Sequence, residues 1–209
     1  FSFHRQILSF LLESAKSSLP PGGNIVYTDI TEFLGVAMKV SLLGGLVLAM
    51  PVILYQVVMF ISPALKPAER RYLFYLLPAC LLAFAAGGAF SYKVLIPPSM
   101  RFLVTFGSDV ATPMIRIGNL VNLMITLLFW SGVIFQTPIV MFFLAKIGIV
   151  NHRSLARWRR FAVVGAFVLS AIITPTFDPI NQALMALPII VLYELGIWLA
   201  RLARWGEKK

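Results

Sequence analysis

Charged residues are the scarcest class in this sequence. They make up 12% of its 209 residues, whereas 59% are hydrophobic. Soluble domains average about 25% charged residues, and one of this length could not bury so much apolar surface. The composition therefore indicates a membrane protein. The 18 lysines and arginines outnumber the 8 acidic residues, but they are dispersed among turns instead of forming one patch, which disfavours nucleic-acid binding.

Residue patterns of catalytic and metal sites are also missing. The single cysteine, Cys80, lies in an apolar run and can support neither a disulfide framework nor a cysteine metal site. The two histidines, His4 and His152, are expected on opposite sides of the membrane, so they cannot share a site. No Gly-x-Ser-x-Gly, His-Glu-x-x-His or phosphate-binding loop occurs. We expect no enzyme activity, no cofactor and no metal.

Long uncharged runs are what the sequence has in abundance. No charged residue occurs between Val40 and Leu65. A helix rises about 1.5 Å per residue and a bilayer core is about 30 Å thick, so about twenty such residues span it. The last two runs are short for a bilayer of ordinary thickness. The runs predict an all-α, polytopic membrane bundle in one domain, residues 1–209, with five spans at about 34–62, 73–95, 119–146, 161–175 and 180–200.

The basic residues set the expected orientation. Eleven of the 18 fall in three segments, 66–72, 152–160 and 201–209, which the span count places on one side. The positive-inside rule makes that side the cytoplasm. Residues 1–32 then lie outside with nothing visible to translocate them, so we infer a preceding span that this chain does not contain. The intact protein would have six spans and both ends in the cytoplasm.

Prolines and glycine pairs shape the expected packing. Pro51, Pro138 and Pro188 lie inside spans, where a missing backbone donor should kink each helix and create concave faces. The pairs Gly44-Gly45 and Gly87-Gly88 also lie inside spans. Small residues let neighbouring helices approach closely, so we interpret both pairs as packing positions.

A few polar residues inside the spans need partners. Gln136 is the most central, and it suits equally a helix-to-helix hydrogen bond or the docking of a partner. Lys39 lies near the outer end of the first span, where its side chain is expected to snorkel. Glu194 lies toward the cytoplasmic end of the last span, where it either snorkels or pairs with Arg201.

The turn before the last span carries a candidate cap. Asp178 lies in the segment from Pro175 to Pro179, and its side chain can accept orphan backbone amides as a helix N-cap. Asn181 and Gln182 begin the last span and are further candidates for that cap.

A series of ordered motifs resembles the TatC family, the signal-receptor subunit of the twin-arginine protein translocase. The resemblance extends over essentially the whole chain from about Leu19. Its motifs are Thr31–Phe33, Pro51–Gln56, Phe60–Arg71, Arg101–Leu103 with Phe106-Gly107, Phe135–Pro138, Thr174-Pro175 with Asp178 and Gln182, and Leu187-Pro188 through Tyr193-Glu194.

The resemblance implies a six-helix, glove-shaped protein of the inner (plasma) membrane with a concave face. It implies binding of the twin-arginine signal peptides of folded cargo, assembly with single-span TatA and TatB proteins, homo-oligomers within the complex, and transport driven by the proton-motive force. One acidic residue of the family's signal site maps onto Glu69, and the other belongs to an N-terminal segment that this chain lacks.

Other residues fall around these implied sites. Arg70 and Arg71 follow Glu69 in the basic turn of residues 66–72, and Phe60 precedes that turn; these residues are the implied signal-peptide contacts. The plain alternative for Glu69 is a surface ion pair with Arg70 or another basic neighbour. The implied partner-docking and intramembrane polar positions are Gln136, Pro138 and Gln182.

At Gln136 the chain departs from the family, in which many members have glutamate. Glutamine keeps hydrogen-bonding capacity without a buried charge, so docking is expected to survive, whereas a proton relay is not. A small-solute transporter or channel is the alternative function. It would need ionisable residues at mid-membrane, and the chain offers only the uncharged Gln136 and Gln56; no internal repeat supports it.

Overall fold

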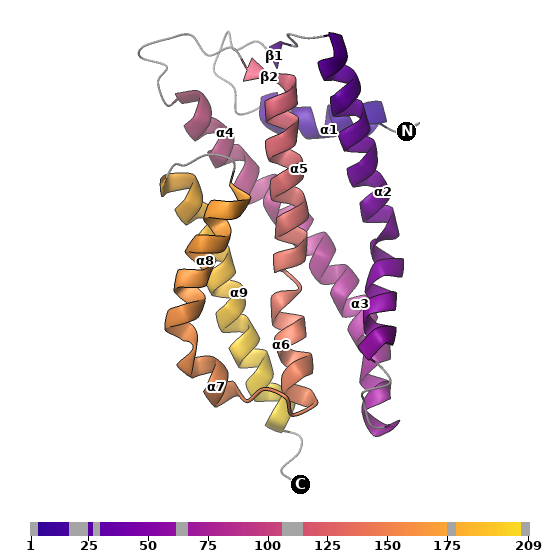
Figure 1. Ribbon diagram of the computed structural model, residues 1–209, viewed down its shortest axis with the longest axis vertical. Coiled ribbons are helices and arrows are strands. Elements are labelled where there is room, and N and C mark those ends of the chain that lie inside the picture. Colours follow the sequence, from indigo (N-terminus) through magenta and orange to yellow (C-terminus); the bar gives the residue numbers. More distant parts are fainter. Residues whose placement is uncertain are drawn as a thin grey trace. The chain divides into compact units, whose positions relative to one another are not determined.

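The protein is described by a computed structural model, which is helical almost throughout (Figure 1). The structure describes residues 4–16, 25–26, 30–61, 67–105, 115–174 and 179–205. Its elements are α1 (His4–Lys16), β1 (Ile25–Val26), α2 (Ile30–Ile61), α3 (Pro67–Phe90), the π-helical segment η2 (Ser91–Leu95), α4 (Ile96–Thr105), β2 (Ile115–Arg116), α5 (Ile117–Ile134), α6 (Thr137–Lys146), α7 (His152–Arg157), α8 (Arg159–Ile173) and α9 (Pro179–Trp205). The predicted all-α membrane bundle is confirmed. The parallel pair of β1 with β2 was not predicted.

Four helical stretches within the described residues are long and apolar enough to cross a membrane. They are Thr31–Val57, Leu76–Thr105, Ile117–Lys146 and Gln182–Ala203, and each overlaps a span predicted from the sequence. The remaining predicted span, 161–175, overlaps α8, a helix of 15 residues. That length is below the usual range of about 17–25 residues, so a crossing by α8 stays a prediction.

The second predicted span has the wrong end. We expected a long connection over residues 93–118. Instead η2 carries the chain from α3 into α4, and the Ile96 N–H donates to the Ser91 carbonyl, one residue beyond the α-helical register. Pro97 and Pro98 follow directly in α4, and the helix continues past both of them to Thr105.

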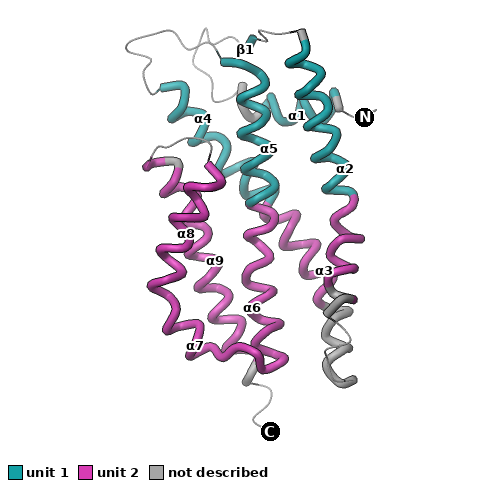
Figure 2. Tube along the Cα trace, viewed as in Figure 1, with its two compact units in different colours: residues 1–48, 88–130 teal, residues 49–87, 131–209 magenta. Residues whose placement is uncertain are grey.

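The chain divides into two compact units, which are described separately (Figure 2). Unit 1 comprises residues 1–48 and 88–130, and unit 2 comprises residues 49–87 and 131–209. The three prolines that were predicted to kink their helices occupy different helix positions. Pro51 and Pro188 lie inside α2 and α9 without ending those helices, whereas Pro138 lies just after the break between α5 and α6.

In unit 1, α1 packs against α4 and η2. Leu8 and Leu11, one helical turn apart, are buried. The ring of Phe10 stacks on that of Tyr92 at 4.4 Å, and the Tyr92 hydroxyl donates to the Phe10 carbonyl at 2.9 Å. The segment of residues 1–32, predicted only as an extracytoplasmic loop, is therefore anchored by an amphipathic helix.

The starts of α2 and α5 lie at the same end of unit 1. Strand β1 pairs with β2 just before them, and the Glu32 carboxylate accepts the Gly118 backbone N–H at 2.9 Å. A carboxylate near the first turn of α5 satisfies an orphan N–H and opposes the positive end of the helix dipole. The two helices therefore run in the same direction.

In unit 2, α6 and α8 pack on α9 (Figure 1). The small side chains Ala145, Ala200 and Ala203 form a buried cluster, against which Phe142 and Leu155 pack. Small residues at a helix interface let the backbones approach closely, which favours association inside a membrane.

One glycine of each predicted pair is a close contact. A Cβ on Gly87 would lie 2.7 Å from the Ser131 carbonyl oxygen, and one on Gly44 would lie 2.9 Å from the Cδ1 atom of Ile7. Gly45 and Gly88 have nothing within 4 Å of the same position. The packing interpretation is therefore confirmed for Gly87 and Gly44.

Candidate functional site

The implied signal-peptide position begins a helix. We expected Glu69 in a short turn of residues 66–72, but α3 begins at Pro67 and puts Glu69 in its first turn. Proline suits the first helical position because no intrahelical N–H bond is lost there. A carboxylate in a first turn is also favoured by the helix dipole.

The side chains of the four implied contacts, Phe60, Glu69, Arg70 and Arg71, lie outside the described part of the structure. Their backbones belong to the last turn of α2 and the first turns of α3. The bound peptide's contacts therefore stay predictions.

At the predicted proline kink, α5 and α6 are separated by a two-residue turn, Phe135-Gln136. The Gln136 N–H donates to the Val133 carbonyl at 3.0 Å, a tighter repeat than that of an α-helix, and the Gln136 carbonyl accepts the Val140 N–H at 2.9 Å. Pro138, which is buried, follows in the first turn of α6, where its missing N–H costs least.

The Gln136 side chain bonds to a neighbouring helix. Its Nε2 donates to the Cys80 carbonyl in α3 at 2.9 Å. This contact confirms the first of the two interpretations of Gln136, a helix-to-helix hydrogen bond. Its Oε1 is buried and has no partner within the described residues, and partner docking at this residue stays a prediction.

A second polar contact joins the same two helical segments. The Ser131 hydroxyl donates to the Gly87 carbonyl at 2.8 Å in a buried setting. Gly132 is equally close to α3, since a Cβ there would lie 2.5 Å from the ring of Phe84. Together with Gln136, Ser131 fixes α3 against the α5–α6 break. Sequence reasoning missed Ser131, although a polar residue five positions before Gln136 was a usable signal.

Gln182 bonds to α8. Its Nε2 donates to the Phe167 carbonyl at 3.0 Å, and its own backbone carbonyl accepts the Ser170 hydroxyl at 2.5 Å. The Gln182 side chain thus links α9 to α8. This hydrogen bond does not cap α9, which was the predicted role. Asp178 and Pro175, the predicted turn residues, lie outside the described residues.

The predicted pairing of Glu194 with Arg201 is wrong. The Glu194 carboxylate bonds to Arg159 on α8, with 2.9 Å between Oε2 and Nη2. Arg201 is two helical turns away, about 10 Å along α9, whereas the packing of α8 on α9 brings Arg159 within reach. The nearby Tyr193 hydroxyl donates to the Leu155 carbonyl at 2.9 Å.

The described residues hold no group of three or more His, Cys, Asp or Glu side chains that could bind a metal ion. Their recorded polar contacts include hydrogen bonds between helices and the exposed ion pair of Arg159 with Glu194. Such contacts fix the packing of a membrane bundle.

Three comparisons bear on this arrangement. The family model described as "Sec-independent protein translocase protein (TatC)" matches residues 1–188. A protein of that name from Carboxydothermus hydrogenoformans is 36% identical over 189 residues, which cover 88% of this chain and 78% of that protein. One from Aquifex aeolicus is 36% identical over 211 residues, which cover 100% of this chain and 87% of that protein.

A solved structure points to the same family as the family model and the two relatives. The crystal structure titled as the twin arginine translocase receptor TatC superposes with a TM-score of 0.86 at 35% identity, covering 97% of this chain and 88% of that chain. The resemblance seen in the sequence motifs therefore extends to the helical architecture, and the chain is a multi-pass membrane protein that belongs to the TatC family of Sec-independent protein translocases.

Proposed function

We propose that this protein is the core receptor of a twin-arginine translocase, which binds the twin-arginine signal peptides of folded proteins. The observation that carries the proposal is the likeness to a solved translocase receptor at a TM-score of 0.86 over 97% of this chain. The same comparisons do not favour a small-solute transporter or channel.

Glu69 is the proposed arginine contact. A carboxylate can accept two parallel N–H bonds from one guanidinium, and such a charge-assisted pair is stronger at a membrane interface than in bulk water. Phe60 is an apolar residue in the last turn of α2, just before this segment. By the positive-inside rule, Arg70 and Arg71 hold the start of α3 at the cytoplasmic face. Both chain termini of the intact protein lie on that side of the inner membrane.

We further propose that single-span TatA- and TatB-type proteins dock against the spans and that several copies assemble within the complex. Gln136, Pro138 and Gln182 mark the proposed docking region. Apolar side chains on one side of α8, including Val164, Val168 and Ile172, are exposed in the single chain, which supports coverage of this helix by lipid or by a partner helix.

The test of the receptor proposal is peptide binding by charge variants at position 69. A charge-assisted hydrogen bond contributes about 1.5–3 kcal/mol, so Glu69→Ala should weaken binding about tenfold to a hundredfold. Glu69→Lys should weaken it further. Changing both peptide arginines to lysine should reproduce part of the loss, because lysine keeps the charge without the planar fork.

Binding is measured in membranes on protein that includes the family's N-terminal cytoplasmic segment, since the second acidic residue is expected there. Glu13→Lys, on the exposed face of α1, is the matched control and should bind normally. Unchanged affinity of Glu69→Lys for the twin-arginine peptide would place recognition elsewhere. Purification with single-span partners would separate a translocase core from a transporter, which would instead bind a small solute alone.

A further inference from the structure

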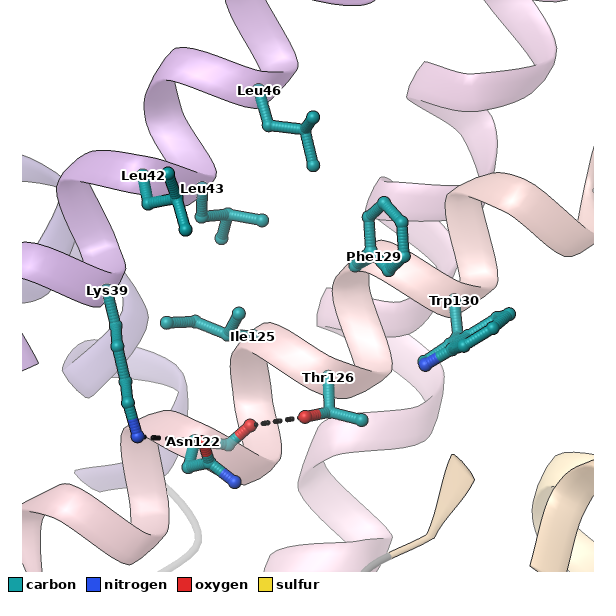
Figure 3. Close-up of a pocket in the computed structure, with 9 residues that line it drawn as sticks. All are labelled: Lys39, Leu42, Leu43, Leu46, Asn122, Ile125, Thr126, Phe129 and Trp130. Carbon is teal, nitrogen blue, oxygen red and sulfur yellow. Dashed lines mark hydrogen bonds between the residues drawn. The ribbon is translucent and has the colours of Figure 1, made fainter. Parts of the chain in front are cut away.

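A groove with a cavity volume of about 310 Å³ lies between α2 and α5, wholly within unit 1 (Figure 3). Its polar end is formed by Lys39, Asn122 and Thr126, and its apolar end by Leu46, Phe129 and Trp130. The volume is at the lower end of the range of about 300–1,000 Å³ that is typical of small-molecule pockets.

The polar end carries a positive charge that has no negative partner among the described residues. The Lys39 ammonium donates to the Asn122 side-chain oxygen at 3.1 Å (Figure 3). The Thr126 hydroxyl donates to the Asn122 backbone carbonyl at 2.8 Å. No ion pair of Lys39 is recorded within the described residues, where its partner is a neutral amide. An ammonium has three donors, and two of those of Lys39 remain available.

The charge lies within a candidate membrane span, Thr31–Val57. Ionisable side chains there are costly, and they mark functional positions because the charge needs a partner. Basic pockets between membrane helices bind anionic lipid headgroups. A neutral apolar helix placed in this groove would leave the Lys39 charge without a counterion.

The groove also has a direction. Helical side chains lean toward the N-terminal end of their helix, and α2 and α5 both begin at the same end of unit 1. The Lys39 ammonium and the Asn122 amide therefore lie toward that end, while Leu46 and Trp130 lie deeper. From Lys39 to Leu46 the apolar part extends about 10 Å along α2.

We propose that this groove binds one anionic phospholipid, whose phosphate contacts Lys39 and Asn122 and whose acyl chain lies along Leu46 and Phe129. The lipid belongs to the leaflet at the start of α2, which the predicted topology makes the outer one. Its binding would brace α2 against α5. The proposal concerns lipid and does not depend on signal-peptide recognition.

The test is lipid retention by the full chain, reconstituted in nanodiscs of equimolar phosphatidylglycerol and phosphatidylcholine, extracted, and measured by native mass spectrometry. The variants are Lys39→Gln, which removes the charge, Lys39→Arg, which keeps it, and Leu46→Trp, which fills the apolar part. Lys93→Gln is the matched control, because Lys93 is an exposed lysine in another candidate span and does not line the groove.

Wild type, Lys39→Arg and Lys93→Gln should retain one phosphatidylglycerol. Lys39→Gln should retain it about fivefold less, as expected for one basic residue facing an anionic headgroup. Leu46→Trp should also lose the phosphatidylglycerol, because it fills the apolar part of the groove, although the Lys39 charge is unchanged. Excess inorganic phosphate should not displace the lipid, because phosphate leaves the apolar part empty.

Three results would overturn the proposal. Equal retention by Lys39→Gln and wild type would remove the role of the charge. Retention of phosphatidylcholine equal to that of phosphatidylglycerol would mean that the groove binds lipid through its apolar part alone. A photoreactive phenylalanine analogue at Phe129 that cross-links a polypeptide in native membranes, and no lipid, would assign the groove to a helix instead.

Discussion

At Gly87, in unit 2, one added methyl group would overlap the backbone of a neighbouring helix. In Gly87→Ala the new Cβ would lie 2.7 Å from the Ser131 carbonyl oxygen and 2.9 Å from the Cα atom of Gly132. Both are backbone atoms, so no side-chain rotation relieves the overlap. Ordinary van der Waals contacts begin at 3.4 Å. To restore one between the new Cβ and the Ser131 carbonyl oxygen, α3 and α5 must separate locally by about 0.7 Å, which is 3.4 Å minus 2.7 Å.

That separation also acts on the buried hydrogen bond. The Ser131 hydroxyl lies 2.8 Å from the Gly87 carbonyl, and an equal shift would lengthen the distance to about 3.5 Å, at which little of the bond remains. Overpacking alone costs about 1–3 kcal/mol. Replacing glycine by alanine inside a helix gains up to about 1 kcal/mol, which partly offsets this cost.

Gly88→Ala isolates the overlap. It has the same gain in helix propensity on the same helix, but nothing lies within 4 Å of its added Cβ. Gly87→Ala should therefore have an unfolding free energy about 1–3 kcal/mol lower than that of Gly88→Ala. Unfolding is followed by tryptophan fluorescence during denaturant titration in micelles. Equal unfolding free energies for the two variants would refute the close approach of α3 to α5.

Three further predictions test other contacts. Gln136→Leu should lower the unfolding free energy by only about 0.6 kcal/mol, the mean for a hydrogen bond between membrane helices, and should weaken cross-linking to a single-span partner, whereas Gln136→Glu should keep the cross-linking; full cross-linking by the leucine variant would leave Gln136 a packing role alone. Glu194→Gln should change stability by no more than about 1 kcal/mol, because the side chains of the pair with Arg159 are 52% and 39% exposed; a larger loss in a thermal melt would contradict this weak pairing. Cysteines at Ala68 and Ser154 should react with an impermeant thiol reagent only from the cytoplasm, and one at Ser108 only from outside; labelling of Ala68 and Ser108 from the same side would overturn the span count.

Local patterns sufficed for the class of protein and for most of its spans. Hydropathy is a property of each segment by itself, and the bilayer demands a fixed length of apolar helix. Four predicted spans therefore overlap described helices that meet this length. Pro138 marked the interruption before α6, since the missing N–H of proline acts on its own turn, but Pro51 and Pro188 gave the same signal and lie inside helices that continue. The signal-peptide residues came from the family motifs, whereas Gln136 also stood out by itself as a central polar residue inside a span.

The second span shows where local signals mislead. Pro97 and Pro98 favour a helix end in any sequence-based reading. The helix instead continues through the π-helical segment Ser91–Leu95 and past both prolines to Thr105. Only the backbone conformation of the preceding turn decides between these outcomes.

The contacts between helices required the tertiary structure. Lys39 and Asn122 are 83 residues apart in the sequence, Gln136 and Cys80 are 56 apart, and Arg159 and Glu194 are 35 apart. The sequence identified Lys39, Gln136 and Glu194 as polar groups in need of partners, but helical periodicity relates only residues a few positions apart. Which partner each one meets depends on the rotation and depth of the neighbouring helix. For the same reason the sequence marked both glycines at 87 and 88, and packing made only Gly87 a contact.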